Sequence, residues 1–248
     1  MKTMNSSVTR RFYACRLAVR TAAFAGLLFY ALALPERFAA DLAAGPLHPS
    51  PMTALWLLLM ASMVFRLFPS RLESLGCQKV FGSRFRSTGR VVSPQAVREA
   101  DLGAGRVLAV WAAANALILL AYRQGLADQR FLVCLAGFYG VCDIFCVLFF
   151  CPFQAWIMHN RCCTTCRIYN WDYLMLCTPL LALHNAFSQS ACILATVVFL
   201  RWEVTYLFRR ERFFESSNQS LQCRHCQEHL CRWKPGGKDL SKQTKASG

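Results

Sequence analysis

The sequence predicts an all-α fold, an integral membrane helical bundle of about six transmembrane helices with a cytoplasmic N-terminus and a cytoplasmic C-terminus. Three observations predict it. The 248 residues are 55% hydrophobic and only 17% charged, whereas soluble domains carry about 25% charged residues. The apolar residues stand in long blocks, and about 17 to 20 such residues cross a bilayer core as a helix. Basic residues gather between alternate blocks, as they do in cytoplasmic loops.

The apolar blocks define the elements in chain order. The predicted spans are 17–34, 52–68, 107–122, 131–150, 173–187 and 191–208. The first follows a basic leader, and the fourth carries a single charge, Asp143. The last two are short and form a predicted hairpin, in which Arg201 extends its guanidinium toward the headgroups. We therefore expect a bundle over 1–208 and a cytoplasmic cysteine-rich basic tail over 209–248, disordered towards its end.

The first block allows a second interpretation. Ala31-Leu32-Ala33 resembles the cleavage site of a signal peptide. Cleavage would remove the first span and leave the orientation of the other spans unchanged. Because the block 17–34 is longer than the roughly 7–15 residues of a signal core, we expect the span to be retained.

The distribution of Lys and Arg predicts the orientation and the location. All of the 28 basic residues except Arg37, Arg123 and Arg130 fall in segments that lie inside when the N-terminus is inside. This asymmetry predicts a multi-pass protein of the inner (cell) membrane. It also explains the net charge of +15, so nucleic-acid binding need not be invoked. The sequence contains no motif that recognises nucleic acid. The basic stretch 66–106 predicts contact with anionic headgroups of membrane lipids at the cytoplasmic face.

Two cysteine clusters are the strongest chemical signal. One contains Cys162, Cys163 and Cys166, and the other contains Cys223, Cys226 and Cys231. Each includes a C-x-x-C step, and the predicted hairpin brings both to the cytoplasmic side. Because the cytosol keeps thiols reduced, such clusters favour metal binding or redox cycling over permanent disulfides.

The pattern favours a metal site, because two C-x-x-C steps supply the four ligands of a tetrahedral zinc ion. The predicted ligands are Cys163, Cys166, Cys223 and Cys226, with Cys162 and Cys231 as competitors and His225 or His229 as substitutes. Such a site would join loop 160–167 to tail 223–231 and have a structural, sensory or docking role.

Three alternatives stay open. Four cysteines also hold an iron–sulfur cluster, and a cysteine pair could serve a membrane thiol-redox protein. A soft-metal transporter would use Asp143 and Cys146, since a carboxylate inside a span is a functional candidate. In the structural alternative, Asp143 pairs with a polar group such as Asn115. Phosphate-binding, H-E-x-x-H and G-x-S-x-G motifs are absent from the sequence, so an enzyme is not expected.

The second half of the chain carries a resemblance. It rests on Cys151-Pro-Phe-Gln, on Asn160 to Asp172 with its C-C-x-x-C, on Arg201-Trp-Glu and on Cys223-Arg-His-Cys226. Over 142–232 the chain resembles a group of uncharacterised bacterial multi-pass membrane proteins with a CCxxC cytoplasmic loop and a CxxC cysteine-rich C-terminal tail. The resemblance implies that the two clusters belong together and implies no activity.

Overall fold

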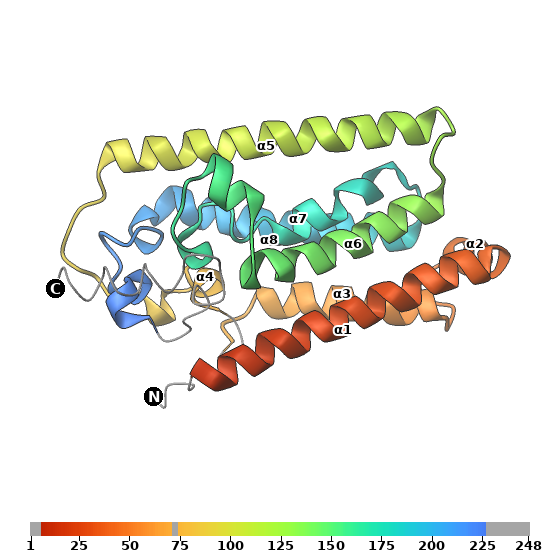
Figure 1. Cartoon of the computed structure of the whole chain (residues 1–248), viewed down its shortest axis with the longest axis horizontal. Coiled ribbons are helices and arrows are strands. Elements are labelled where there is room, and N and C mark those ends of the chain that lie inside the picture. Colours follow the sequence, from red (N-terminus) through yellow and green to blue (C-terminus); the bar gives the residue numbers. More distant parts are fainter. Residues whose placement is uncertain (1–5, 71–73, 227–248) are drawn as a thin grey trace.

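The structure is a computed structural model that describes residues 6–70 and 74–226 (Figure 1). Helices form this part of the chain, and its described residues contain no strand, only an isolated bridge between Ser87 and Asn218. The α-helices are α1 (Ser6–Ala33), α2 (Pro35–Ala44), α3 (Pro51–Arg66), α4 (Leu75–Gln78), α5 (Pro94–Arg123), α6 (Gln129–Leu148), α7 (Asp172–Cys177) and α8 (Ala186–Phe208). Short turns of 3-10 or π helix are η1 (Gly82–Arg84), η2 (Phe153–Ile157), η3 (Cys163–Thr165), η4 (Thr178–Ala182), η5 (Arg210–Arg212), η6 (Gln219–Leu221) and η7 (Cys223–His225).

Four of the described helices are long and apolar enough to cross a membrane. They comprise Arg11–Ala33, Pro94–Arg123, Gln129–Leu148 and Ala186–Phe208, and two shorter apolar helices are Pro51–Arg66 and Asp172–Ala182. The all-α prediction is therefore confirmed for the described residues, with four helices of membrane-spanning length. The count of six spans and the orientation of the termini stay predictions.

The fifth predicted span is shorter than the sequence indicated. The α-helical part ends at Cys177, and a 3-10 turn with Pro179 near its start continues only to Ala182. Proline has no N–H and cannot donate the α-helical hydrogen bond. Asn185, which the prediction placed inside the span, instead caps α8 by accepting a hydrogen bond from the Ser188 N–H at 3.0 Å.

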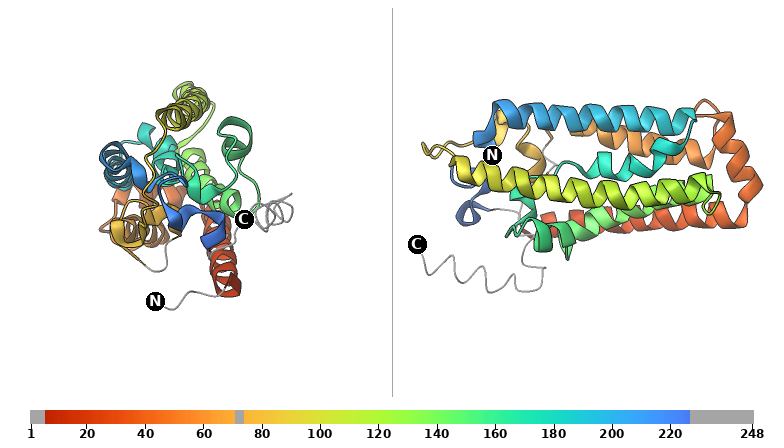
Figure 2. Two further views of the ribbon diagram at one scale, coloured as in Figure 1. Left: turned by 90° about the vertical axis from the view of Figure 1, so that its left-hand side faces the viewer. Right: turned by 90° about the horizontal axis from the view of Figure 1, so that it is seen from above.

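The long helices run side by side along one axis, and α2 lies across one end (Figure 2). Helix α1 packs on α6, and α8 packs on α3 and α7. Helix α5 lies along one side of the bundle (Figure 1), where it contacts η2 and η4. Large apolar side chains point outward, such as Phe29 at 69% exposure and Leu117 at 68%. Such surfaces suit lipid rather than water.

One end of the bundle gathers the connections that the sequence predicted to be cytoplasmic. Residues 67–70 and 74–93, 149–171 and 209–226 all lie at the end where α1 begins (Figure 1). We call these residues the basic end. The other end holds α2 and the α5–α6 turn (Figure 2).

The first part of the predicted tail packs against the rest of the chain. Phe213 stacks on Trp202 and Tyr206 of α8, with ring centroids 4.7 and 5.0 Å apart. The Thr88 N–H donates to the Ser217 carbonyl oxygen at 3.0 Å. Residues 209–226 are therefore fixed to the basic end, and the predicted disorder of the last residues falls outside the described part.

Candidate functional site

The first cysteine cluster lies in the α6–α7 loop at the basic end. Helix α6 ends ahead of Pro152, and the chain passes through η2 into the turn η3, Cys163–Thr165. The Cys166 N–H donates to the Cys163 carbonyl oxygen at 3.0 Å. This bond closes a tight turn around the two threonines, and a two-residue gap is the common spacing of paired zinc ligands.

The first two sulfurs of this cluster contact groups of their own loop. Cys163 is buried, and its thiol donates to Gln154 Oε1 at 2.8 Å. Cys162 is half-buried, with Sγ 3.1 Å from the Thr164 hydroxyl. These neighbours are polar, so the sulfurs do not serve as apolar packing groups.

Cys166 is buried beside two groups that would stabilise a thiolate. Burial raises the pKa of its thiol, while a hydrogen bond from the Ile168 N–H and the nearby Lys79 ammonium oppose that rise. Both opposing groups favour the negatively charged sulfur, which is the form that binds metals.

The second cluster begins with a turn of the same kind. In η7 the Cys226 N–H donates to the Cys223 carbonyl oxygen at 3.1 Å. Cys226 has φ −68° and ψ 128°, close to the −64° and 136° of Cys166. Cys223 is exposed and Cys226 is half-buried. Cys231 and His229 lie outside the described residues.

Lys79 is the residue that the sequence analysis missed. It follows α4, is only 3% exposed, and its Nζ has no hydrogen-bond partner among the described residues. Burial lowers its pKa to about 8, against the charges of three cysteines and a glutamate: Cys166, Cys162, Cys77 and Glu215. Lys79 Nζ lies 5.9 Å from the centroid of the Trp202 ring. A buried ammonium without a hydrogen-bond partner is unfavourable, so this position favours a negative neighbour. In the sequence, Lys79 stands in a basic stretch for which lipid contact was predicted. The one sign of a different role was a cysteine two residues earlier, Cys77.

Lys79 is brought inside because α4 packs on the cysteine loop. The Ser74 and Tyr169 hydroxyls lie 2.7 Å apart. A Cβ on Gly76 would lie only 2.6 Å from the Tyr169 ring. The glycine allows the close approach that buries both Cys77 and Lys79.

Two ion pairs anchor the end of the loop to the helices. Arg167 binds Glu203 through both terminal guanidinium nitrogens, at 2.8 and 2.6 Å, and Trp171 Nε1 donates to the same carboxylate at 2.8 Å. Arg66 at the end of α3 pairs with Asp172 at 2.8 Å. These polar residues, which belong to the segments that carry the family resemblance, therefore hold the cysteine loop in place.

Asp143 has a partner that the sequence analysis did not foresee. Arg20 Nη1 of α1 lies 2.6 Å from Asp143 Oδ2 and donates to the Gly140 carbonyl oxygen at 2.8 Å. Asn115, the partner suggested from the sequence, donates to the Trp111 carbonyl oxygen instead, so that pairing is wrong. The Cys146 carbonyl oxygen lies 3.7 Å from the Cys163 sulfur.

The four favoured ligands do not form a closed site in this structure. Across residues 6–70 and 74–226, no three His, Cys, Asp or Glu side chains are grouped so that they could hold a metal ion. Both C-x-x-C turns lie at the basic end, but the described part does not bring their sulfurs into one shell. The four-cysteine site stays a prediction, with Cys231 and His229 as further ligands outside the described part.

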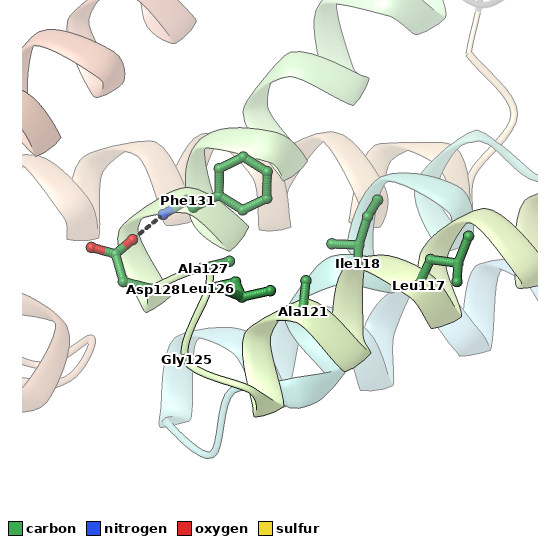
Figure 3. Close-up of a pocket in the computed structure, with 8 residues that line it drawn as sticks. All are labelled: Leu117, Ile118, Ala121, Gly125, Leu126, Ala127, Asp128 and Phe131. Carbon is green, nitrogen blue, oxygen red and sulfur yellow. Dashed lines mark hydrogen bonds between the residues drawn. The ribbon is translucent and has the colours of Figure 1, made fainter.

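A hollow lies at the other end, between α5 and α6 (Figure 3). It is an open groove of about 580 Å³. Its lining is Leu117, Ile118, Ala121, Gly125, Leu126, Ala127, Asp128 and Phe131. The lone carboxylate accepts a hydrogen bond from the Phe131 N–H at 2.8 Å and pairs with Arg130 at 2.6 Å. With this apolar lining and an engaged carboxylate, the groove lacks the chemistry of the basic end.

No family model, curated protein or solved structure matches the chain. The functional argument therefore rests on the residues themselves.

Proposed function

We propose that this chain is a six-span inner-membrane protein whose cytoplasmic end holds a zinc ion through cysteines of loop 160–167 and tail 223–231. The site would fasten the tail to the bundle in a structural, sensory or docking role. An iron–sulfur cluster is the alternative occupant. The observation that carries the proposal is the buried Lys79.

The positive charge of Lys79 links this residue to a metal site. A zinc ion with four thiolates carries a net charge of −2, and a buried ammonium needs a nearby negative charge. Lys79 lacks a hydrogen-bond partner among the described residues, and three cysteine sulfurs are among the groups that act on it electrostatically. Two of these three, Cys166 and Cys162, are candidate ligands. A bound metal would keep their sulfurs ionised, and the thiolate charge would add to that of the Glu215 carboxylate near the ammonium.

The fixed position of the tail supports a shared site. Gln219 N–H donates to the Arg86 carbonyl oxygen at 2.8 Å, and Cys223 follows shortly after. The loop and the start of the second cluster therefore lie at the same end of the bundle, which supports a shared site. This proximity lowers the entropic cost of bringing the loop and the tail together around a metal ion.

The same end would face the cytoplasm and its anionic lipid headgroups. Alternate connections carry nearly all of the basic residues, which favours this orientation. Six crossings require α3 and the α7–η4 segment to span as well, although both are short. Their neighbours α8 and α6 could shield them from lipid.

Elemental analysis of the detergent-purified protein tests the proposal. We expect about one zinc per chain, lost in Cys163→Ser and in Cys226→Ser and kept in Cys134→Ser, which removes a cysteine from α6. Iron with sulfide in place of zinc would select the cluster. Absence of both metals from the wild-type protein would overturn the metal site.

A further inference from the structure

A separate pair of cysteines lies inside the helical bundle, between α7 and α8. Cys192 Sγ lies 3.6 Å from the Cys177 carbonyl oxygen, and Cys177 Sγ lies 3.9 Å from the Ala191 carbonyl oxygen. The two thiols are also close enough to influence each other electrostatically. Each sulfur thus lies against the backbone of the other segment, and the two sulfurs are neighbours.

The two thiols differ in access. Cys177 is 1% exposed, whereas Cys192 is half-buried. Cys192 lies about 9 Å along the α8 axis from Ala186, the first residue of the helix. The next residue, Ile193, is 66% exposed on an apolar surface. In a membrane, Cys192 is therefore approached from lipid, and Cys177 only through Cys192.

This placement restricts the reactant. Charged, water-soluble disulfides do not enter the hydrocarbon layer, because transferring charge out of water is costly. A lipid-soluble, uncharged two-electron oxidant does enter, and quinones form the chemical class that combines these properties.

We propose that Cys177 and Cys192 form a redox-active dithiol that a membrane quinone oxidises to a disulfide. The S–H bonds of both residues break and one S–S bond forms. Two electrons and two protons pass to the quinone, which becomes a hydroquinone. Cys192 reacts with the quinone first, and Cys177 then attacks the Cys192 sulfur and releases the reduced product.

The reaction needs no metal at the basic end, so it stands independently of the proposed zinc site. It also differs from simple packing. Two thiols that only fill space would stay reduced in the presence of an oxidant and would still react with an alkylating reagent. Two neighbouring thiols of a redox pair would instead form a disulfide.

The test is quinone treatment of the full-length protein in detergent, with a short-chain ubiquinone analogue under anaerobic conditions. After treatment the protein is denatured and its thiols are alkylated with N-ethylmaleimide. Peptides containing Cys177 and Cys192 are then analysed by mass spectrometry before and after reduction. We expect both residues to lose labelling together by at least fivefold, a linked peptide, one hydroquinone formed per linkage, and recovery on reduction. Prior removal of metal should not change this result.

Matched variants define the specificity. Cys177→Ala and Cys192→Ala should abolish hydroquinone formation, whereas Cys134→Ala on α6 should react as the wild type does. Copper phenanthroline serves as a second oxidant for the wild-type protein. Linkage with copper but not with quinone would overturn the choice of oxidant. Failure to link with either would overturn the dithiol itself.

Discussion

Arg20 of α1 and Asp143 of α6 form an ion pair, with Nη1 and Oδ2 2.6 Å apart and with about a fifth of each side chain exposed, 21% and 22%. The pair joins the first helix to the centre of the bundle, where α1 packs along α6. Removal of α1 as a signal peptide would leave the Asp143 carboxylate without this partner. The pair therefore favours retention of the first helix, and it engages the carboxylate that a transport pathway would need.

Breaking this pair on one side should destabilise the bundle. We expect Arg20→Met to lower the free energy of unfolding by about 2–3 kcal/mol, somewhat less than for a fully buried pair, because an unpaired carboxylate remains. Thermal unfolding in detergent is the measurement. The double variant Arg20→Met/Asp143→Leu should recover most of the loss. A double variant as unstable as the two single variants combined would contradict the pairing.

The sequence predicted the elements well and the polar contacts poorly. Each of the six apolar blocks overlaps a helical segment, although the fifth segment ends early, at Ala182. Block length and hydropathy are local properties, which is why the sequence predicts these segments. The Arg20–Asp143 contact and the burial of Lys79 depend instead on how distant segments pack. From the sequence alone, Arg20 and Lys79 cannot be distinguished from exposed basic residues of a cytoplasmic segment. The same limit applies to the predicted metal ligands. The C-x-x-C spacing predicts each turn, but it does not predict whether two distant turns come together.

The Arg167–Glu203 pair should be a main support of the cysteine loop. We expect Glu203→Gln to lower stability by about 2–4 kcal/mol, because the buried Arg167 would keep only the more distant Asp101 carboxylate, 3.5 Å from its Nε. The exposed pair Arg209–Glu211 has side chains 63% and 40% exposed, so Glu211→Gln is the matched control, with about 0.5 kcal/mol or less. Chemical or thermal unfolding of both variants gives the comparison. Equal effects would refute the structural role of Glu203.

Close packing at Gly76 should be intolerant of a methyl group. Gly76→Ala would force the Tyr169 ring away, with an expected loss of about 1–3 kcal/mol. The control is Gly105→Ala in α5, where a Cβ meets nothing within 4 Å; there we expect a neutral or slightly stabilising effect. Faster alkylation of Cys77 in Gly76→Ala, measured by mass spectrometry, would accompany the loosening. An unchanged melting temperature and unchanged Cys77 labelling would show that α4 does not need this contact.

Lys79 gives the metal-free protein a characteristic pH dependence. Its pKa of about 8 in the folded protein lies below the ordinary 10.5, so the charged form opposes folding below pH 8. Between these values the unfolded chain holds a proton that the folded chain has released, and stability rises with pH. Lys79→Met should therefore stabilise the chelator-treated protein at pH 7, by about 3 kcal/mol, and the advantage should shrink toward pH 10.5. An advantage that is equal at both ends of this range, or absent at pH 7, would contradict the burial of a charged Lys79.

The central claim is that loop and tail sulfurs share one ion, and X-ray absorption at the zinc edge tests it most directly. The wild-type protein should show three or four sulfur neighbours at about 2.3 Å. Cys166→His and Cys226→His should each retain zinc and each exchange one sulfur for one nitrogen. A change in one variant and not in the other, or a wild-type spectrum dominated by nitrogen and oxygen, would show that the two segments do not hold the ion together.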